Sequence, residues 1–430
     1  MEYYPEEEMM TSRERVRKAL NHELPDRVPL DLGSTPVTGI SASALSRLRK
    51  ALGLEDRPVK VHEPYQILGQ VEEDVLDALE IDIVGIDMRN TMFGYPNYRW
   101  KPWRTGDGTE VLIGEGFTTS EDERGDTFVY PGGDITARPC ARMPKGGFYF
   151  DTIVRQETID EDHLDPKEWI EGMFPQFTDE DLAHLQQQAD HLYHNTSRAI
   201  IGNFGQGGLG DIALVPGPWL KNPKGIRDPE QWYTAHLLHP EYIKCIFDLQ
   251  TEQVLKNLEL YHQAVGDKIE AIFISGTDFG TQNGPFISPD LYREMYKPFH
   301  QRINRWVHSH TRWKTFFHSC GSVVAFLDDF VDAGVDILNP VQCSAAGMDP
   351  KFLKEKYGDR LVFWGGGIDT QRVLPFGKPD EVREQVKERV QIFGKGGGFV
   401  FNTIHNIQTG TPVENLVALF EAFKNCRTLQ

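Results

Sequence analysis

The stretch KTFFHSCGSVV, residues 314–324, sets three strand-forming residues directly before a histidine, a cysteine and a glycine. Thr315, Phe316 and Phe317 favour a strand, because β-branched and aromatic side chains pack well on a pleated surface. A strand that ends in His318 and Cys320 brings two chemically reactive groups to the edge of a sheet. The position of this strand in the fold therefore decides what the two groups can do.

Seven other short apolar runs resemble this stretch, with helical segments between most of them. They are RVPLDLG (27–33), DIVGID (82–87), AIIGNFG (199–205), EAIFIS (270–275), DILNPV (336–341), LVFWGG (361–366) and GFVFNT (398–403). The runs are nearly continuous rather than alternating, which is typical of parallel strands buried on both faces. Eight strands alternating with helices predict an α/β fold of the (β/α)8 TIM barrel type, one domain over residues 1–430. A doubly wound open sheet is the alternative.

The interval between the second and third predicted strands is too long for a plain barrel repeat. Residues 89–156 are rich in turns and aromatic residues, and RTGDGTEVLI and DERGDTFVYP have the pattern of hairpins around DG and RGD turns. We expect an inserted β-rich subdomain over the barrel mouth, where long insertions often shape a substrate pocket. Its aromatic residues could wall an aromatic substrate or form a local core; they are Tyr95, Tyr98, Trp100, Trp103 and Phe117.

Composition excludes several functional classes. The net charge of −19 argues against general nucleic-acid binding. The five cysteines are scattered and odd in number, which fits a reducing cytoplasm better than a disulfide framework. We find no signal peptide at the N-terminus and no apolar run long enough to cross a membrane, so we expect a cytoplasmic enzyme without membrane contact.

Barrel enzymes carry their reactive groups at the carboxyl ends of the strands. Polar and soft side chains follow the predicted strands at these ends: Asp31, Asp87, Asn203, Asp278, Gln282, His318, Cys320, Gln342, Cys343, Asp369, Asn402 and His405. We expect Asp278 and Asp87 to act in catalysis, and Asn203, Gln282 and Gln342 to bind substrate. A carboxylate at a strand end can equally serve only to bind local backbone amides.

His318 and Cys320 are two residues apart, so in an extended segment their side chains point the same way. Imidazole and thiolate together favour Zn²⁺, which needs a third protein ligand. His405 and Cys343 are the candidates, with Asp278 a weaker one. The alternative is a core histidine beside a small buried cysteine.

The longest of these patterns resemble the uroporphyrinogen decarboxylase superfamily. The similar segments are TSRERVRKALNHELPDRVPLD (11–31), ISPDLYREMYKPFHQRI (287–303), FHSCG (317–321), FWGGGID (363–369) and FNTIHNIQTGTPVENL (401–416). The resemblance implies a (β/α)8 barrel, in agreement with the strand count. It also implies one of two branches, the metal-free decarboxylases or the cobalamin-linked methyltransferases.

Two features distinguish the branches. The decarboxylases hold a tetrapyrrole with an arginine-rich segment of the form RQAGR, whereas this sequence reads LDLGSTPVTGIS there and has no further arginine before Arg47. Several methyltransferases carry a zinc site of the form HxC…C. Here His318 and Cys320 match its first part, and His405 stands six residues before Thr411 in place of the closing cysteine.

We therefore expect a zinc-dependent methyltransferase that moves a methyl group between a small substrate and cobalamin. The substrate would be a methoxylated aromatic, a methylamine or a thiol. No cobalamin-binding DxHxxG motif is present, so the cobalamin would arrive on a corrinoid partner protein; we also consider a homodimer. The alternative is a metal-free decarboxylase-like lyase with His405 and Asp87 as the catalytic pair. A third hypothesis is a corrinoid or tetrapyrrole carrier.

Overall fold

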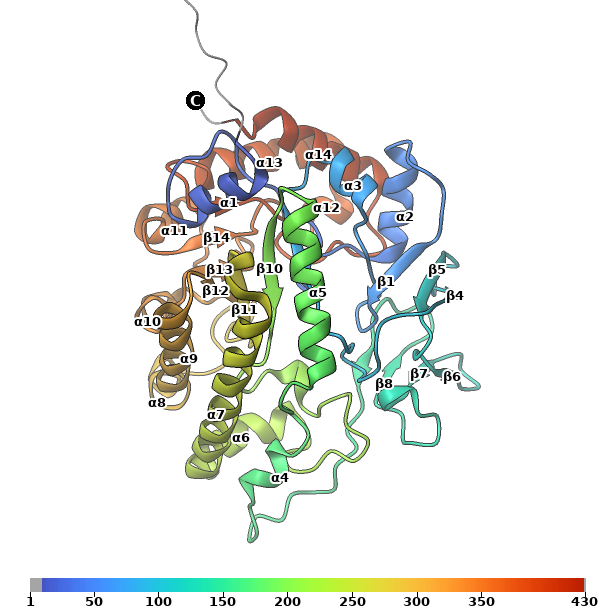
Figure 1. Cartoon of the computed structure of the whole chain (residues 1–430), viewed down its shortest axis with the longest axis vertical. Helices are drawn as coiled ribbons and strands as arrows, with labels where there is room; N and C mark the ends of the chain where they lie inside the picture. Colours follow the sequence, from blue (N-terminus) through green and yellow to red (C-terminus); the bar gives the residue numbers. More distant parts are fainter. Residues whose placement is uncertain (1–9, 429–430) are drawn as a thin grey trace, which may run out of the picture.

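A seven-stranded parallel sheet forms the centre of the computed structural model, which describes residues 10–428 (Figure 1). Its order is β15-β14-β13-β12-β11-β10-β3. The strands are β3 (Ile83–Ile86), β10 (Ala199–Asn203), β11 (Ala271–Ser275), β12 (Lys314–His318), β13 (Ile337–Asn339), β14 (Val362–Trp364) and β15 (Phe399–Val400). Each lies within a run predicted as a strand, and most of their residues are buried, as the continuous apolar pattern indicated.

The first predicted strand, residues 27–33, is wrong as a regular strand. Leu30 makes only an isolated parallel bridge with Phe401. The amide of Leu30 donates to the Asp82 carboxylate at 2.9 Å, so a side chain takes the place of a backbone partner and the ladder does not propagate. The Leu30 segment still joins both edges of the sheet, through Asp31 N–H to Phe401 O and Asp82 N–H to Leu30 O, each 2.9 Å. The sheet thus curls into a TIM-like barrel.

The helices pack around this sheet (Figure 1). They are α1 (Ser12–Leu20), α2 (Ala42–Ala51), α3 (Glu73–Ala78), α4 (Pro166–Ile170), α5 (Asp179–Asn195), α6 (Pro229–Leu238), α7 (Pro240–Val265), α8 (Pro289–Met295), α9 (Lys297–His310), α10 (Leu327–Asp332), α11 (Pro350–Tyr357), α12 (Val373–Phe376), α13 (Pro379–Phe393) and α14 (Val413–Cys426). Helix α5 packs on α7, α7 on α9, and α13 on α14. Helices α4 and α6 lie at the end of the molecule opposite α1 and α13.

The segment LYREMYKPFHQRINRWVHSH (291–310) has helical spacing but forms two helices rather than one. The chain breaks at Tyr296 into α8 and α9. Pro298 explains the break, because proline lacks the N–H that a continuous helix needs and disfavours helical backbone in the residue before it.

Helix α1 closes the amino-terminal end of the barrel. It begins with a capping box, in which Thr11 accepts from the Glu14 amide and the Glu14 carboxylate accepts in return. Its apolar residues Val16 and Leu20 join the buried cluster formed by the inward-facing residues of the strands, among them Phe316. The opposite, carboxyl end of the strands is therefore the end left for a functional site.

The β-rich region forms two further sheets. One has the order β2-β1-β5-β4 and the other β6-β7-β8-β9, with bounds β1 (Val59–Glu63), β2 (Leu68–Gly69), β4 (Trp100–Arg104), β5 (Glu110–Gly114), β6 (Thr119–Glu121), β7 (Thr127–Val129), β8 (Ala141–Met143) and β9 (Asp151–Thr152). Both predicted hairpins are confirmed, as β4–β5 and β6–β7. Strands β1 and β2 precede β3, however, so the β structure is not confined to residues 89–156. Apolar Val59 and Val61 of β1 pair in parallel with Val111 and Ile113 of β5, which draws the earlier segment into the sheet.

Most of the aromatic residues in this region form a local core. Tyr95 and Phe117 are buried, and Trp103 packs edge-on against Phe117 with ring centroids 5.3 Å apart. Tyr98 is exposed, while Trp100 lines a cavity at the strand ends. Among the described helices, none is long and apolar enough to cross a membrane.

Candidate metal centre

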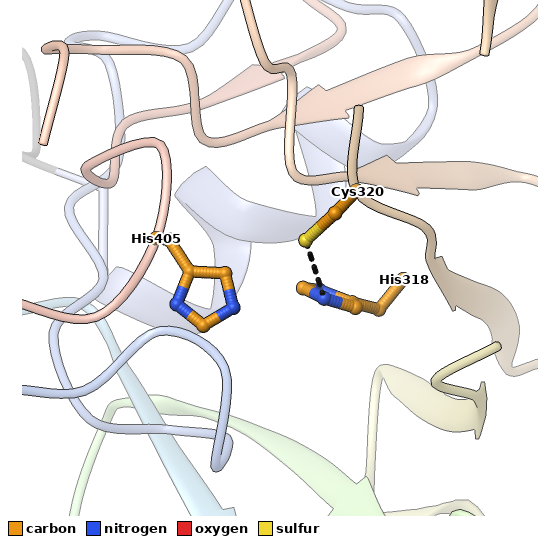
Figure 2. Close-up of side chains that lie close together, drawn as sticks. All are labelled: His318, Cys320 and His405. Carbon is orange, nitrogen blue, oxygen red and sulfur yellow. Dashed lines mark hydrogen bonds between the residues drawn. The ribbon is translucent and has the colours of Figure 1, made fainter. Parts of the chain in front are cut away.

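Three potential metal ligands meet at the carboxyl end of the barrel. His318 ends β12, Cys320 lies two residues further on, and His405 follows β15. One ligand atom from each residue lies within 4.8 Å of the other two (Figure 2). A cavity of about 410 Å³ opens beside this cluster and is lined by Cys320, His405, Gln282 and Gln342 among others.

Asn339 fixes the orientation of His318. Its amide group donates to the Trp364 carbonyl at 2.8 Å, which leaves its Oδ1 facing Nδ1 of His318 at 2.6 Å. Because Oδ1 can only accept, Nδ1 carries the proton and Nε2 has a free lone pair. That lone pair faces the cluster, since the Cys320 thiol donates to Nε2 at 3.3 Å (Figure 2). This is the tautomer that a metal-binding histidine requires.

Asp278 holds Cys320 in place. The Cys320 backbone N–H donates to Oδ1 of Asp278 at 2.6 Å, and the same oxygen lies 3.9 Å from Nε2 of His318. The carboxylate predicted after β11 therefore reaches the cluster and adds negative charge beside it.

Gly321 allows the sharp turn after Cys320. Its φ of +84° is in the left-handed region, and a Cβ at this position would lie 2.3 Å from the Gly280 carbonyl oxygen. Gln342 accepts the Gly321 amide at 2.7 Å and donates to Gln282 at 2.9 Å. The two predicted glutamines thus brace the loop that carries the cysteine.

His405 enters the cluster with a different hydrogen-bond pattern. Its Nδ1 accepts the Asn406 backbone N–H at 2.8 Å, so Nε2 is the nitrogen left for the cluster. A neutral ring with this bond carries its proton on Nε2. Binding a metal through Nε2 requires the proton to move to Nδ1 and the Asn406 bond to be released.

Burial sets the protonation state of the three groups. It lowers the pKa of His318 to about 4, against the opposing hydrogen bond to Asn339. Burial and the neighbouring His318 lower the pKa of His405 to about 4, although Asp278 opposes this. Burial, followed by the charge of Asp278, raises the pKa of Cys320 well above its usual value. At neutral pH the cluster without a cation is two neutral imidazoles and a thiol.

These donors fit a zinc ion. Two imidazoles and one thiolate provide the three protein ligands of a site with one open position, in the nitrogen and sulfur chemistry that Zn²⁺ prefers. Cys343 lies outside the cluster: its thiol donates to the Val341 carbonyl, and it lines a separate hollow with Met348 and Arg389. Burial raises the pKa of Cys343 to about 12.

The other two predicted site residues meet in a neighbouring cavity. Asp87 follows β3, Asn203 ends β10, and the Asn203 amide donates to Asp87 Oδ1 at 2.9 Å. Both line a cavity of about 300 Å³. Apart from Cys343, the predicted site residues that line a cavity are therefore divided between two hollows.

Three residues around the site did not enter the predictions. Asn339 lies inside a predicted strand, directly before Pro340, and nothing in its own segment indicates a histidine partner. His62 alternates with buried residues in β1 and pairs with Asp87. Asp211 ends the glycine-rich segment after β10; burial and then the charge of Asp278 raise its pKa to about 7. The positions of these three residues beside the site follow only from contacts between segments that are distant in the sequence.

Comparison with known proteins finds a family match over the C-terminal part of the chain. The model of the family described as uroporphyrinogen decarboxylase (URO-D) matches residues 220–426. A uroporphyrinogen decarboxylase of Coxiella burnetii is 27% identical over 150 residues, 33% of this chain and 38% of that protein. The chain thus spans less than half the length of this relative. A uroporphyrinogen decarboxylase of Prochlorococcus marinus is 23% identical over 290 residues, 67% of this chain and 76% of that protein.

Methyltransferases are also among the similar proteins. The methylcobamide:CoM methyltransferase MtaA of Methanosarcina barkeri is 28% identical over 176 residues, 39% of this chain and 50% of that protein. A methyltransferase structure from Methanosarcina mazei has a TM-score of 0.54 at 16% identity, covering 97% of this chain and 99% of that one, which shows a shared fold. Residues 220–426 therefore match the uroporphyrinogen decarboxylase (URO-D) family, and the chain is similar both to decarboxylases and to a methyltransferase.

Proposed function

We propose that this protein is a zinc-dependent methyltransferase that moves a methyl group between a small substrate and cobalamin carried by a separate corrinoid protein. The observation that carries the proposal is the convergence of His318, Cys320 and His405 within 4.8 Å of one another, with His318 held in the ligand tautomer by Asn339. The similarity to MtaA supports it, because that name states methylcobamide and CoM as reactants.

The residues of the site would have two kinds of role, metal binding and positioning. His318, Cys320 and His405 would hold the zinc ion. When bound, zinc lowers the pKa of a coordinated thiol or alcohol, or polarises an ether oxygen as a leaving group. Asp278 fixes Cys320 through its amide, and Gln342 fixes the next residue, so the site keeps its shape as substrate enters.

The segment LDLGSTPVTGIS (30–41), where the decarboxylases have arginines, argues against a tetrapyrrole substrate. Its nearest arginine, Arg47, is engaged by the backbone carbonyls of Thr409 and Thr411. Arg27 is paired with Asp82. The acidic side chains of a porphyrinogen would therefore find no free guanidinium from this described segment.

We further propose that residues 89–156 form part of the cover of the barrel mouth. Thr91, Asn97 and Trp100 line the same cavity as the strand-end residue Asp87. The segment is also tied to β1 and β2 through the shared sheet. It is therefore suited to shape the substrate pocket while the whole chain remains one barrel domain.

Metal content and methyl transfer test the proposal. Protein purified without chelator should contain about one zinc per chain. His318→Ala or Cys320→Ser should lose both the zinc and methyl transfer, measured as cob(I)alamin methylation by methoxylated aromatics or methylamines and as thiol methylation by methylcobalamin. Cys343→Ser is the matched control, because this cysteine lies outside the cluster, and it should keep both. Full methyl transfer by chelator-treated, zinc-free protein would contradict the proposal.

A metal-free lyase is the second candidate, and the Asn406 hydrogen bond favours it. With Nδ1 accepting that bond, Nε2–H of His405 is a donor aimed at the cluster rather than a ligand. In this case His405→Gln should abolish decarboxylation of a carboxylated substrate, and the purified enzyme should contain no stoichiometric metal.

A further inference from the structure

A second cavity, of about 300 Å³, adjoins the candidate metal centre. Asp87 and Asn203 reach it from the ends of β3 and β10, and His62 reaches it from β1. Pro36 also lines it, and the carbonyl of Pro36 accepts from the Asn406 amide at 2.8 Å. Asn406 follows His405 and lines the metal-side cavity. The contact between Pro36 and Asn406 therefore lies between the two hollows.

His62 and Asp87 form an oriented pair in this cavity. Nδ1 of His62 lies 3.3 Å from Oδ2 of Asp87, and the Asp87 carboxylate can only accept, so Nδ1 is the protonated nitrogen. Burial lowers the pKa of His62, but the hydrogen bond and charge of Asp87 outweigh it and leave the pKa above its ordinary value. The second nitrogen, Nε2, is turned away from the carboxylate.

Four buried polar atoms of residues that line this cavity have no partner within residues 10–428. They are Nε2 of His62, Oδ1 of Asn203, Oδ1 of Asn97 and Oγ1 of Thr91. The amide nitrogens of both asparagines are used: Asn203 donates to Ser34 O and Asp87, and Asn97 donates to His62 O at 2.7 Å. Their orientation is thereby fixed, and Asn203 is only 8% exposed. Buried polar atoms are nearly always hydrogen-bonded, so these atoms are available to a hydrogen-bonding ligand or to water.

The remaining wall of the cavity shows what kind of donor fits. The Asp87 side chain is 50% exposed, which leaves a carboxylate facing the space. The nearby cation Arg89 is paired with Glu180 at 2.6 Å, and the Gln188 amide donates to Asp87 O at 2.8 Å. The free atoms of His62, Asn203 and Asn97 are therefore acceptors when His62 is neutral, and only the Thr91 hydroxyl can also donate. The described lining leaves no free cation for an anionic group. Apolar walls come from Met88, Met92 and Trp100.

We propose that this cavity is a substrate subsite that binds a protic head group, a hydroxyl or an amine, through Asn203, His62 and the Asp87 carboxylate. The proposal rests on the function proposed above, since it places the head group of the methyl donor or acceptor beside the metal centre. In this subsite Asp87 acts on the ligand both directly and by holding His62. A ligand without a donor would leave the buried oxygens unpaired.

Binding of small probes to the full-length protein tests the subsite without any methyl transfer. Dissociation constants for phenol, benzylamine, fluorobenzene and benzoate are measured by ligand-observed NMR titration at pH 8. Phenol or benzylamine should bind about tenfold more tightly than fluorobenzene and benzoate, because only the first two donate a hydrogen bond to the buried acceptors. The stronger of the two identifies the head group as hydroxyl or amine. Equal affinity for all four probes overturns the proposal.

Variants then assign the binding to this cavity. Asn203→Leu and His62→Leu should each weaken the preferred probe about tenfold. His308→Gln is the matched control, because His308 forms a similar pair with Asp336 at 2.7 Å near the amino-terminal end of β12. This variant should bind the preferred probe as tightly as the wild-type protein does. If Asn203→Leu does not fold, His62→Leu carries the test. Unchanged affinity in a folded variant contradicts the assignment.

The subsite and the proposed function fail in distinguishable ways. His318→Ala should lose metal and methyl transfer yet bind the protic probe with the wild-type constant. If the protein prefers the hydrogen-bond-donating probes but contains no zinc and transfers no methyl group, the subsite is supported and the methyltransferase proposal is overturned. Methyl transfer by a protein that binds all four probes equally supports the methyltransferase and overturns the subsite.

Discussion

At the scale of single residues, hydrogen bonds prepare the candidate metal centre before any cation arrives. Asn339 fixes the tautomer of His318, and Asp278 fixes the backbone of Cys320. The lowered pKa values of His318 and His405, about 4 in each case, keep both imidazoles neutral near pH 7. Neither ring therefore has to lose a proton to bind a metal near neutral pH, although the single proton of His405 must move from Nε2 to Nδ1.

The pKa of the Cys320 thiol is raised, whereas the pKa values of the two histidines are lowered. Metal binding is therefore predicted to release a proton from the thiol. Because the pKa of Cys320 is raised, the group is a thiol near neutral pH and must lose its proton to become a ligand. Zinc binding should release about one proton per chain, measured by calorimetry in two buffers of different ionisation enthalpy.

Cys320→Ser should abolish this release, and Cys343→Ser should leave it unchanged. Zinc binding without proton release would show that Cys320 is not a ligand.

At the scale of elements, one buried carboxylate ties α1 to the start of β3. Asp82 accepts from Ser12, Arg15 and Arg27 and from the Leu30 amide, at 2.7–2.9 Å. Its side chain is fully buried. The same residue therefore anchors the helix that closes the amino-terminal end and the segment that closes the barrel.

Removing the charge of Asp82 should be costly. Asp82→Asn removes the carboxylate that pairs with Arg27 and leaves Arg15 only its second partner, Asp26. The substitution should lower the free energy of unfolding by about 3 kcal/mol, measured by urea denaturation. Asp380→Asn, which removes an exposed partner of Arg383, should change it by less than about 0.5 kcal/mol. Similar effects of the two substitutions would refute this role for Asp82.

At the scale of the whole molecule, the barrel closes through very few bonds. The amides of Asp31 and Phe401 pair the Leu30 segment with the β15 edge, and the amide of Asp82 pairs it with the β3 edge. A closed barrel has no open edge, so these amides are protected although the Leu30 segment forms no regular strand ladder.

Hydrogen exchange measures this closure. Peptides covering 28–32, 80–84 and 399–402 should exchange as slowly as those of the central strands β11 and β12, because opening them requires opening the barrel. Peptides of the β6–β7 hairpin (119–129), which lies outside the barrel, should exchange faster. Fast exchange in 80–84 would indicate an open sheet.

Much of the fold could be predicted because each strand is locally encoded. Runs such as AIIGNFG and EAIFIS are apolar on both faces and bounded by helical segments, and they became β10 and β11. The first strand could not be predicted correctly, because the Asp82 carboxylate takes the Leu30 amide from 52 residues away. The β-rich region begins earlier than the predicted residues 89–156 for a similar reason. Strand β1 pairs with β5, about 50 residues later in the chain, through pairs such as Val59 with Val111.

The chemistry available at the strand ends follows from the sequence alone: a His-x-Cys pair after the fifth run, a histidine after the last, and carboxylates and amides between them. The tertiary structure alone decided which of these meet. It brings His405 rather than Cys343 to His318 and Cys320, and it moves Asp87 and Asn203 into a second cavity with His62. Side-chain direction at a strand end depends on the turns that follow and on partners from other strands, and no local pattern encodes either.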